Sequence, residues 1–337
     1  MQIIGLTKAA GFAVLTFTLI ATPAWSQTNQ NSFKETPILY SQSQSNRDLA
    51  IIHYGRGIDY ADLQKWDLAL SEFSKAIALD PTYAEAYDNR GFVYRNQQKW
   101  DLALADFNQA IKLNPNHANA YNNRGSVYSD LQKWDLALAD YTQAIRLNPN
   151  FANAYYNRGN VYHNQQKWDL AVANLTQAIR LNPNFANAYN NRGSVYRNQE
   201  KWDLAVADLT QAIRLNPNYA DAYYNRGNVY RNQEKWDLAV ADYTQAIRLN
   251  PNDADAYYNR GNVYRNQEKW DLAVADLTQA IRLNPNDADA YKNRGFVYYR
   301  LGDINKARQD FQRAAQLYRT QGNTAEYELV IRVLNLL

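Results

Sequence analysis

The chain has 337 residues, with 36 Lys and Arg against 33 Asp and Glu, three histidines and no cysteine. The opposite charges are interleaved, so no basic stripe or acidic tail indicates binding to nucleic acid or to lipid headgroups. The lack of cysteine excludes disulfides and thiolate chemistry, and the separate placement of His53, His117 and His163 gives no paired ligands for a metal site.

Residues 1–26 have the features of a secretory signal peptide. Lys8 precedes a short apolar stretch within Ala9–Thr22, and small residues at Ala24 and Ser26 predict cleavage before Gln27. The alternative is a membrane anchor, but the apolar stretch of about fourteen residues is shorter than the roughly twenty that a spanning helix needs. The sequence therefore predicts export to the periplasm or the extracellular space, with no membrane span after cleavage.

Residues 27–49 are rich in Gln, Ser and Asn and contain few apolar side chains. Such a segment buries too little surface to offset the entropy of ordering, so we expect a flexible leader.

From residue 50 to residue 321 the chain repeats every 34 residues without a gap. The stretches Ala220–Asp253 and Ala254–Asp287 differ only at Tyr243 and Leu277. A fixed period of this length is typical of a stacked repeat array, in which each unit contacts its neighbours. The eight units are 50–83, 84–117, 118–151, 152–185, 186–219, 220–253, 254–287 and 288–321.

Each unit contains the apolar pattern of two helices. In the sixth unit, helical spacing over residues 220–230 is interrupted at residues 231–235, and a second helical pattern begins at Trp236. Pro251 ends that pattern because proline cannot continue a helix. A mid-helix glycine costs about 1 kcal/mol against alanine. Its recurrence at Gly227 and its equivalents predicts helices that cross too closely for a side chain.

This pattern, Tyr223…Gly227…Tyr230…Ala239…Tyr243…Ala246…Pro251, resembles the tetratricopeptide repeat. The resemblance implies an all-α, right-handed superhelical solenoid of antiparallel helix pairs. It also implies that the first helices line a concave face that binds a partner, usually a peptide segment.

The sequence departs from that family where an arginine precedes the glycine in place of the usual leucine. Two interpretations remain open. The arginines pair with neighbouring carboxylates and join adjacent units, with Asp101 and Asp237 as candidate partners, or they contact a ligand. The arginines concerned are Arg56, Arg90, Arg124, Arg158, Arg192, Arg226, Arg260 and Arg294.

Residues 322–337 are expected to form a capping helix, with Asp303 capping the helix before it and Asn323 and Glu326 forming a capping box. Its predicted packing face consists of Tyr327, Val330, Ile331, Leu334 and Leu337. Leu329, Val333 and Leu336 lie on another side, where they would serve self-association.

One face of the first helices carries a row of asparagines at the sixth place of each unit. An asparagine matches the N–H and C=O of one peptide group, so the row would hold an extended chain by its backbone. The equally weighted alternative is that each asparagine bonds to the adjacent repeat. The row is Asn89, Asn123, Asn157, Asn191, Asn225, Asn259 and Asn293.

Side chains around this row are candidates for selecting a ligand, because Tyr and Arg dominate many interfaces. The alternative is a solvated helix face. They are Tyr156, Tyr224 and Tyr258 at the fifth place, Asn160, Asn228 and Asn262 at the ninth, and Arg197, Arg231 and Arg265 at the twelfth.

No phosphate loop, nucleophile elbow or zinc motif occurs, and a repeated residue set does not make the single cluster that catalysis requires. We therefore expect an exported, non-catalytic scaffold without a cofactor, which binds an extended peptide or protein segment in its concave groove. The alternatives are a self-associating rod joined through the C-terminal helix and an accessory subunit that docks an enzyme of the cell envelope.

Overall fold

The structure, a computed structural model, describes the backbone of residues 36–337 and the side chains from residue 42 onward. This part of the chain is helical, with no strand between residues 36 and 337. The signal peptide predicted at residues 1–26 and the start of the leader at 27–35 lie outside the described residues. The helices are α1 (Thr36–Asp62), α2 (Trp66–Leu79), α3 (Ala84–Asn96), α4 (Trp100–Leu113), α5 (Ala118–Asp130), α6 (Trp134–Leu147), α7 (Ala152–Asn164), α8 (Trp168–Leu181), α9 (Ala186–Asn198), α10 (Trp202–Leu215), α11 (Ala220–Asn232), α12 (Trp236–Leu249), α13 (Ala254–Asn266), α14 (Trp270–Leu283), α15 (Ala288–Arg300), α16 (Ile304–Thr320) and α17 (Thr324–Leu336).

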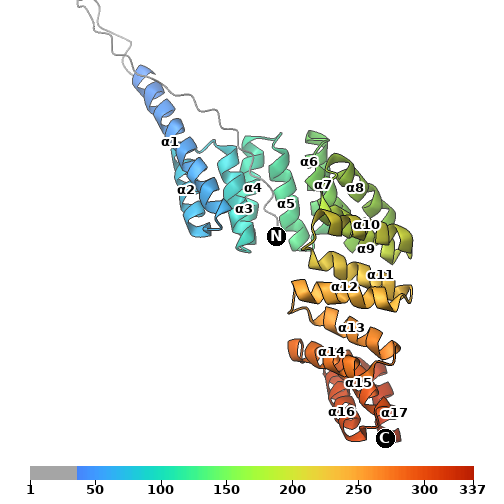
Figure 1. Ribbon diagram of the computed structural model, residues 1–337. Helices are drawn as coiled ribbons and strands as arrows, with labels where there is room; N and C mark the ends of the chain where they lie inside the picture. Colours follow the sequence, from blue (N-terminus) through green and yellow to red (C-terminus); the bar gives the residue numbers. More distant parts are fainter. Residues whose placement is uncertain (1–35) are drawn as a thin grey trace, which may run out of the picture. The chain divides into compact units, whose positions relative to one another are not determined.

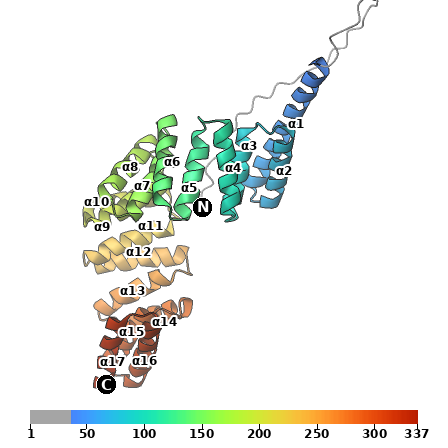
Figure 2. The same cartoon turned by 180° about the vertical axis from the view of Figure 1, so that it is seen from behind.

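The helices form two compact units, with α1–α6 in the first, which ends at residue 149, and α7–α17 in the second, residues 150–337. Within each unit every helix packs on the next one along the chain, so the units are stacks of helix pairs (Figures 1 and 2). Odd-numbered helices also contact the next odd-numbered helix, as α9 contacts α11 and α11 contacts α13. Even-numbered helices of the described chain make no comparable contacts with one another. The first helices of successive pairs therefore approach more closely, on the inner side of each stack.

These observations confirm the predicted all-α solenoid of helix pairs. The helix pairs follow the 34-residue period, and each pair is closed by a tight turn. In the sixth unit the amide of Lys235 donates to the carbonyl of Tyr230 at 2.8 Å, and that of Glu234 donates to Arg231 at 3.0 Å. Glu234 has a φ of 57°. This left-handed conformation, which normally favours glycine, recurs at residues other than glycine in seven turns, at Gln64, Gln98, Gln132, Gln166, Glu200, Glu234 and Glu268.

The core is built from small residues of one helix and larger residues of the next. Ala239 and Tyr243 of α12 form a buried cluster with Val263 of α13, which belongs to the following pair. A Cβ atom at Gly227 would lie 2.9 Å from the ring atom Cε1 of Tyr243. The predicted close crossing at the glycine is confirmed, because the ring occupies the space of the missing side chain.

The arginines before these glycines act structurally. Arg226 donates from Nε and Nη2 to both carboxylate oxygens of Asp242 at 2.7 and 2.8 Å, and from Nη1 to Thr210 of the preceding pair at 2.9 Å. The rings of Tyr223 and Tyr230 lie 5.9 and 5.8 Å from its guanidinium carbon. Equivalent bidentate pairs form at Arg90, Arg124, Arg192, Arg260 and Arg294.

The expected partners, Asp101 and Asp237, were wrong. The carboxylate that pairs lies sixteen residues after the arginine, on the facing helix of the same pair. The aspartate that follows the tryptophan serves another contact: Asp237 accepts from Nε2 of Gln267 in the next pair at 2.9 Å. Arg158 donates to an asparagine, Asn174, at 2.8 Å, and Arg56 is exposed.

The leader prediction needs a correction at residues 36–49, because α1 begins at Thr36. Residues 42–49 are mostly exposed, so the expectation of little burial holds there. Extending a helix whose later turns are already fixed by packing costs little, because the nucleation cost has been met. Arg47 contributes an ion pair to Asp80 at 3.1 Å.

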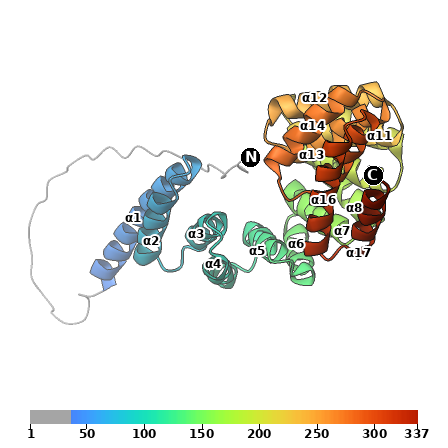
Figure 3. The same ribbon diagram turned by 90° about the horizontal axis from the view of Figure 1, so that it is seen from below.

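Helix α17 packs beside α16 at the end of the second unit (Figure 3). The capping by Asp303 is confirmed, and Asn323 accepts from the amide of Glu326 at 3.3 Å. The side chain of Glu326 does not complete the predicted box, because it binds Nζ of Lys292 at 2.9 Å. The predicted packing face is confirmed, with Val330 fully buried. Val333 packs on the same core, a correction, whereas Leu329 and Leu336 are 45% and 87% exposed.

Deletion of residues 220–253 is expected to leave a folded, shorter protein. Helices α11 and α13 have identical sequences, so α10 would meet the same side chains on α13 that it now meets on α11. The helix content per residue, measured by circular dichroism, should stay unchanged. Loss of most of the helical signal would contradict this expectation.

Candidate functional site

The inner helices carry the predicted site residues. The asparagine row runs along α3 and α5 of the first unit and α7, α9, α11, α13 and α15 of the second, and the tyrosines at the fifth place and the arginines at the twelfth lie beside it on helices of the second unit. Most of these side chains are partly buried, and Asn228, Asn259 and Asn293 are buried. The row is therefore a lining of the stack and not a set of side chains extended into solvent.

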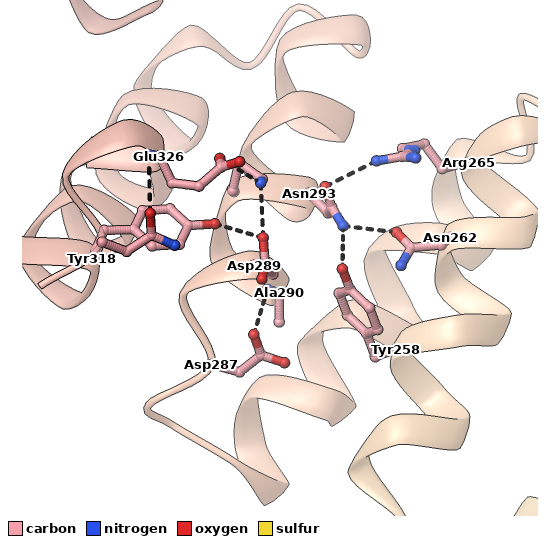
Figure 4. Close-up of polar contacts among 11 residues, drawn as sticks. Tyr258, Asn262, Arg265, Asp287, Asp289, Ala290, Asn293, Tyr318 and Glu326 are labelled. Atoms are coloured by element: carbon pink, nitrogen blue, oxygen red, sulfur yellow. Dashed lines mark hydrogen bonds and ion pairs between the residues drawn. The ribbon is translucent and has the colours of Figure 1, made fainter. Parts of the chain in front are cut away.

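The asparagines donate to the preceding pair. Nδ2 of Asn293 donates to the hydroxyl of Tyr258 at 3.0 Å and to Oδ1 of Asn262 at 2.9 Å (Figure 4). The same two bonds join Asn259 to Tyr224 and Asn228, and Asn191 to Tyr156 and Asn160. Elsewhere Asn225 donates to Asn190, Asn123 to Asp88 and Asn89 to Tyr54. The alternative that each asparagine bonds to the adjacent repeat describes these six residues; Asn157 occupies the same place in α7.

The asparagine carbonyls are also engaged at two positions. Nη1 of Arg231 donates to Oδ1 of Asn259 at 2.7 Å, and Nη1 of Arg265 donates to Oδ1 of Asn293 at 2.9 Å (Figure 4). A carboxamide that already donates twice and accepts from a guanidinium has little capacity for a peptide backbone. At Asn259 and Asn293 these bonds therefore indicate a hydrogen-bond network that supports the surface, in place of an asparagine clamp on a peptide.

The tyrosines at the fifth place serve this network and the core. Tyr224 and Tyr258 receive the asparagine hydrogen bonds, and Tyr156 stacks with Phe185 at a ring separation of 4.8 Å. Burial raises the pKa of the Tyr224 and Tyr258 hydroxyls above their ordinary value, so both stay neutral hydrogen-bonding groups.

Two hollows lie on this face of the second unit. The first, of about 440 Å³, is polar and is lined by Arg197, Tyr224, Asn228, Arg231, Asn232 and Asn259. The second, of about 710 Å³, lies between α13, α15 and α17, and its lining includes Arg265, Phe296, Tyr299, Leu329, Val333 and Leu336. Phe296 and Tyr299 were not predicted from the sequence as site residues. Their signal was available, because they are aromatic at the ninth and twelfth places, where most other units are polar.

The eighth unit has a lysine, Lys292, in place of the fifth-place tyrosine. Its Nζ lies 2.7 Å from Asp289 and 2.9 Å from Glu326, and the hydroxyl of Tyr318 also donates to Asp289 at 2.6 Å (Figure 4). Although partial burial opposes the charge, the hydrogen bonds that Lys292 donates to Asp289 and Glu326 hold its pKa well above its ordinary value. This cation is thus neutralised within the protein.

Comparison with known families decides the classification. Segments 57–98, 93–132, 125–166, 159–199, 193–233, 227–267 and 261–302 match the sequence profile described as TPR repeat, and residues 288–321 match the tetratricopeptide repeat profile. The chain belongs to the tetratricopeptide repeat family. Among curated proteins, none matches this tetratricopeptide repeat (TPR) chain.

Several solved structures are similar to the TPR chain. A chain of the APC/C hetero-tetramer Cut9–Hcn1 matches over 86% of this chain and 55% of its own length, at 18% identity and a TM-score of 0.61. A tetratricopeptide repeat protein from Parabacteroides merdae matches over 74% and 99%, at 20% identity and a TM-score of 0.56. YrrB, described as a TPR protein with an unusual peptide-binding site, matches over 55% and 95%, at 30% identity and a TM-score of 0.46. The first two likenesses show the shared TPR solenoid fold.

Between residues 36 and 337, no cluster of His, Asp and Glu side chains is arranged to hold a metal ion. In the same range, none of the helices combines the length and the apolar character that crossing a membrane requires.

Proposed function

We propose that the protein is an exported, non-catalytic scaffold that binds an extended segment of another protein on the inner helices of residues 150–337. TPR proteins in general are protein-interaction scaffolds without catalytic activity. The observation that carries the proposal is the pair of hollows on one face. One has a polar lining and the other a largely apolar lining, and α13 contributes residues to both. Binding sites of this kind are concave, with a few placed polar groups.

Export rests on different evidence, the charged, apolar and small-residue pattern of residues 1–26. N-terminal sequencing of the protein recovered from its native cell tests it. We expect the mature chain to begin at Gln27, and a chain that retains Lys8 would contradict the proposal.

Binding on the inner helices is tested by filling the polar hollow. Asn232 lines that hollow and is exposed, so Asn232→Trp places a bulky ring in it without removing a core contact. On a random peptide array, we expect this variant to lose at least about tenfold in affinity for peptides that the wild type binds. Leu238→Trp is the matched control, because Leu238 of α12 is 49% exposed on a second helix. Equal binding by wild type and Asn232→Trp, or loss caused by the control, would contradict the proposed surface.

A self-associating rod is the second candidate, and the exposure of Leu336 at 87% favours it. Light scattering of the wild type and of Leu336→Gln separates the two functions. A wild-type monomer at high concentration contradicts the rod, whereas a dimer that dissociates on substitution supports it. An accessory subunit that docks an enzyme of the cell envelope is one form of the first proposal, with an enzyme as the partner.

A further inference from the structure

We infer that the partner segment is acidic and ends in a bulky apolar side chain. Its carboxylates would bind Arg197, Arg231 and Arg265, which we name the arginine row. This inference rests on the proposed binding surface and specifies the chemistry of its ligand.

The inner helices carry two sets of repeated arginines, which differ in their partners. The first set consists of the arginines that precede the helix glycines. All of them except Arg56 and Arg158 are held by both carboxylate oxygens of an aspartate. The arginine row forms no ion pair with any residue between 36 and 337. In the first unit, Arg95 occupies the equivalent place and pairs with Asp130 at 2.8 Å. Missing carboxylates are thus confined to the second unit.

The guanidiniums of the row are partly buried. Arg197 and Arg231 line the same polar hollow, whose lining contains no carboxylate. Burial, and then the charge of the other arginine, favour loss of the proton, so the pKa of Arg197 lies below its ordinary value. Burial likewise lowers the pKa of Arg265. A guanidinium nevertheless stays charged, so an incoming carboxylate would offset a desolvation cost that the protein leaves uncompensated.

The nearby negative groups do not neutralise the row. Glu268, which lines the apolar hollow together with Arg265, lies 3.9 Å from the guanidinium of Arg300. Asp221 and Asp255 lie ten residues before Arg231 and Arg265 on the same helices, which is about 15 Å at 1.5 Å per residue. This exceeds the Debye length of about 8 Å at physiological ionic strength. The carboxyl ends of α9, α11 and α13 offset about half a charge each, which leaves a net positive row. Burial, followed by the charge of Arg197, lowers the pKa of His163, which occupies the twelfth place in α7 and lies outside the row.

Two guanidiniums of the row are held in a fixed orientation. The bonds from Nη1 of Arg231 and Arg265 to Asn259 and Asn293 hold the planar guanidiniums in place. The asparagine network thus positions the arginines, and Nη1 is the only nitrogen of Arg231 with a hydrogen bond inside residues 36–337. A positioned guanidinium is suited to bidentate binding of a carboxylate.

The apolar hollow lies at the end of the row. Arg265 lines this hollow and lies 5.9 Å from the ring centre of Phe296. Tyr299, Leu329 and Leu336 are exposed and line it as well. A segment whose carboxylates follow the row would therefore place its next large side chain against these residues. Nucleic acid fits less well, because a chain with interleaved charges offers it no wider basic surface.

The test compares synthetic peptides on the mature chain by fluorescence anisotropy. The first peptide is a run of glutamates ending in phenylalanine, the second has glutamines for the glutamates, and the third has serine for the phenylalanine. We expect the first peptide to bind most tightly. Of the two peptides that end in phenylalanine, added salt should weaken the binding of the glutamate peptide and leave that of the glutamine peptide unchanged. Equal binding of the glutamine peptide, or stronger binding of a duplex oligonucleotide, would overturn the inference.

The variant Arg197→Gln/Arg231→Gln/Arg265→Gln should bind the acidic peptide with an affinity lower by about 100-fold. Its matched control replaces three exposed arginines of the even-numbered helices, Arg214, Arg248 and Arg282, which changes the net charge equally. That control should stay within about threefold. Arg197→Gln alone breaks a single hydrogen bond, the 3.5 Å contact to Asn198, so it tests the row even if the triple variant unfolds, with an expected loss of about fivefold. Equal losses in row and control variants would refute the arginine row.

Failure of this inference differs from failure of the proposed function. If neutral array peptides bind and Asn232→Trp abolishes their binding, the surface is correct and the acidic ligand is wrong. If no peptide of any composition binds, the proposed function itself is refuted.

Discussion

Asp242→Ala is expected to lower the free energy of unfolding by about 3 kcal/mol. The substitution removes both acceptors of Arg226 while its guanidinium stays between two tyrosine rings, with only 17% of the side chain exposed. Although partial burial opposes the charge, the hydrogen bonds and charge of Asp242 hold the pKa of Arg226 above its ordinary value. Urea denaturation measures the loss, and amide hydrogen exchange of α11 and α12 locates it, because repeat arrays unfold in parts.

The fourth repeat provides the control for this prediction. There Arg158 donates to Oδ1 of Asn174 at 2.8 Å, and Nδ2 of Asn174 donates to the carbonyl of Leu170 at 2.8 Å. Asp242→Asn should adopt the same arrangement and lose only about 1 kcal/mol, since one hydrogen bond to the guanidinium persists. If the alanine and asparagine variants were equally stable, the pairing would contribute nothing beyond the volume of the side chain.

Replacing the seven left-handed turn residues by glycine is expected to raise the free energy of unfolding by about 5 kcal/mol in total. Each Gln or Glu at a φ near 57° bears a steric cost of about 1 kcal/mol or more, and the greater freedom of glycine in the unfolded chain offsets part of the gain. Glu234→Gly alone should gain a few tenths to about 1 kcal/mol, measured by denaturation.

The eighth repeat again supplies the matched control. Gly302 has a φ of 81°, and its amide donates to Tyr299 at 3.0 Å, as Glu234 donates to Arg231. Gly302→Ala should therefore lose about 1 kcal/mol, and no atom would crowd the new methyl group. A stabilised Gly302→Ala, or a destabilised Glu234→Gly, would show that side-chain contacts and not the backbone conformation set the stability of the turn.

The sequence predicted the helix pairs because each element repeats with its own end signals. Trp236, Pro251 and Gly227 mark the start of a helix, its end and a close crossing, and the structure has all three at the expected places. The seven left-handed turns at glutamate and glutamine were missed, since these residues give no signal for a positive φ, whereas Gly302 and Gly322 do.

Side-chain partners were harder to predict than helix positions. Arg226 was expected to pair, but which aspartate faces it depends on the hairpin geometry, and a neighbour in sequence was chosen instead. The asparagine row was placed on the correct helices, whereas its partners 31 and 35 residues earlier follow from the stacking of pairs. The helical start of α1 was missed because a composition rich in Gln and Ser resembles that of unfolded chains.

The polar bonds between consecutive hairpins in residues 150–337 also bear on the kinetics of recognition. Asn259 joins α13 to α11 at the inner helices, Arg226 reaches Thr210 of α10, and Gln267 reaches Asp237 at the start of α12. Two or three such bonds along each seam oppose flexing of the stack. The surface is thus preorganised, and a ligand needs to order only itself, which favours fast association and a lower entropic barrier.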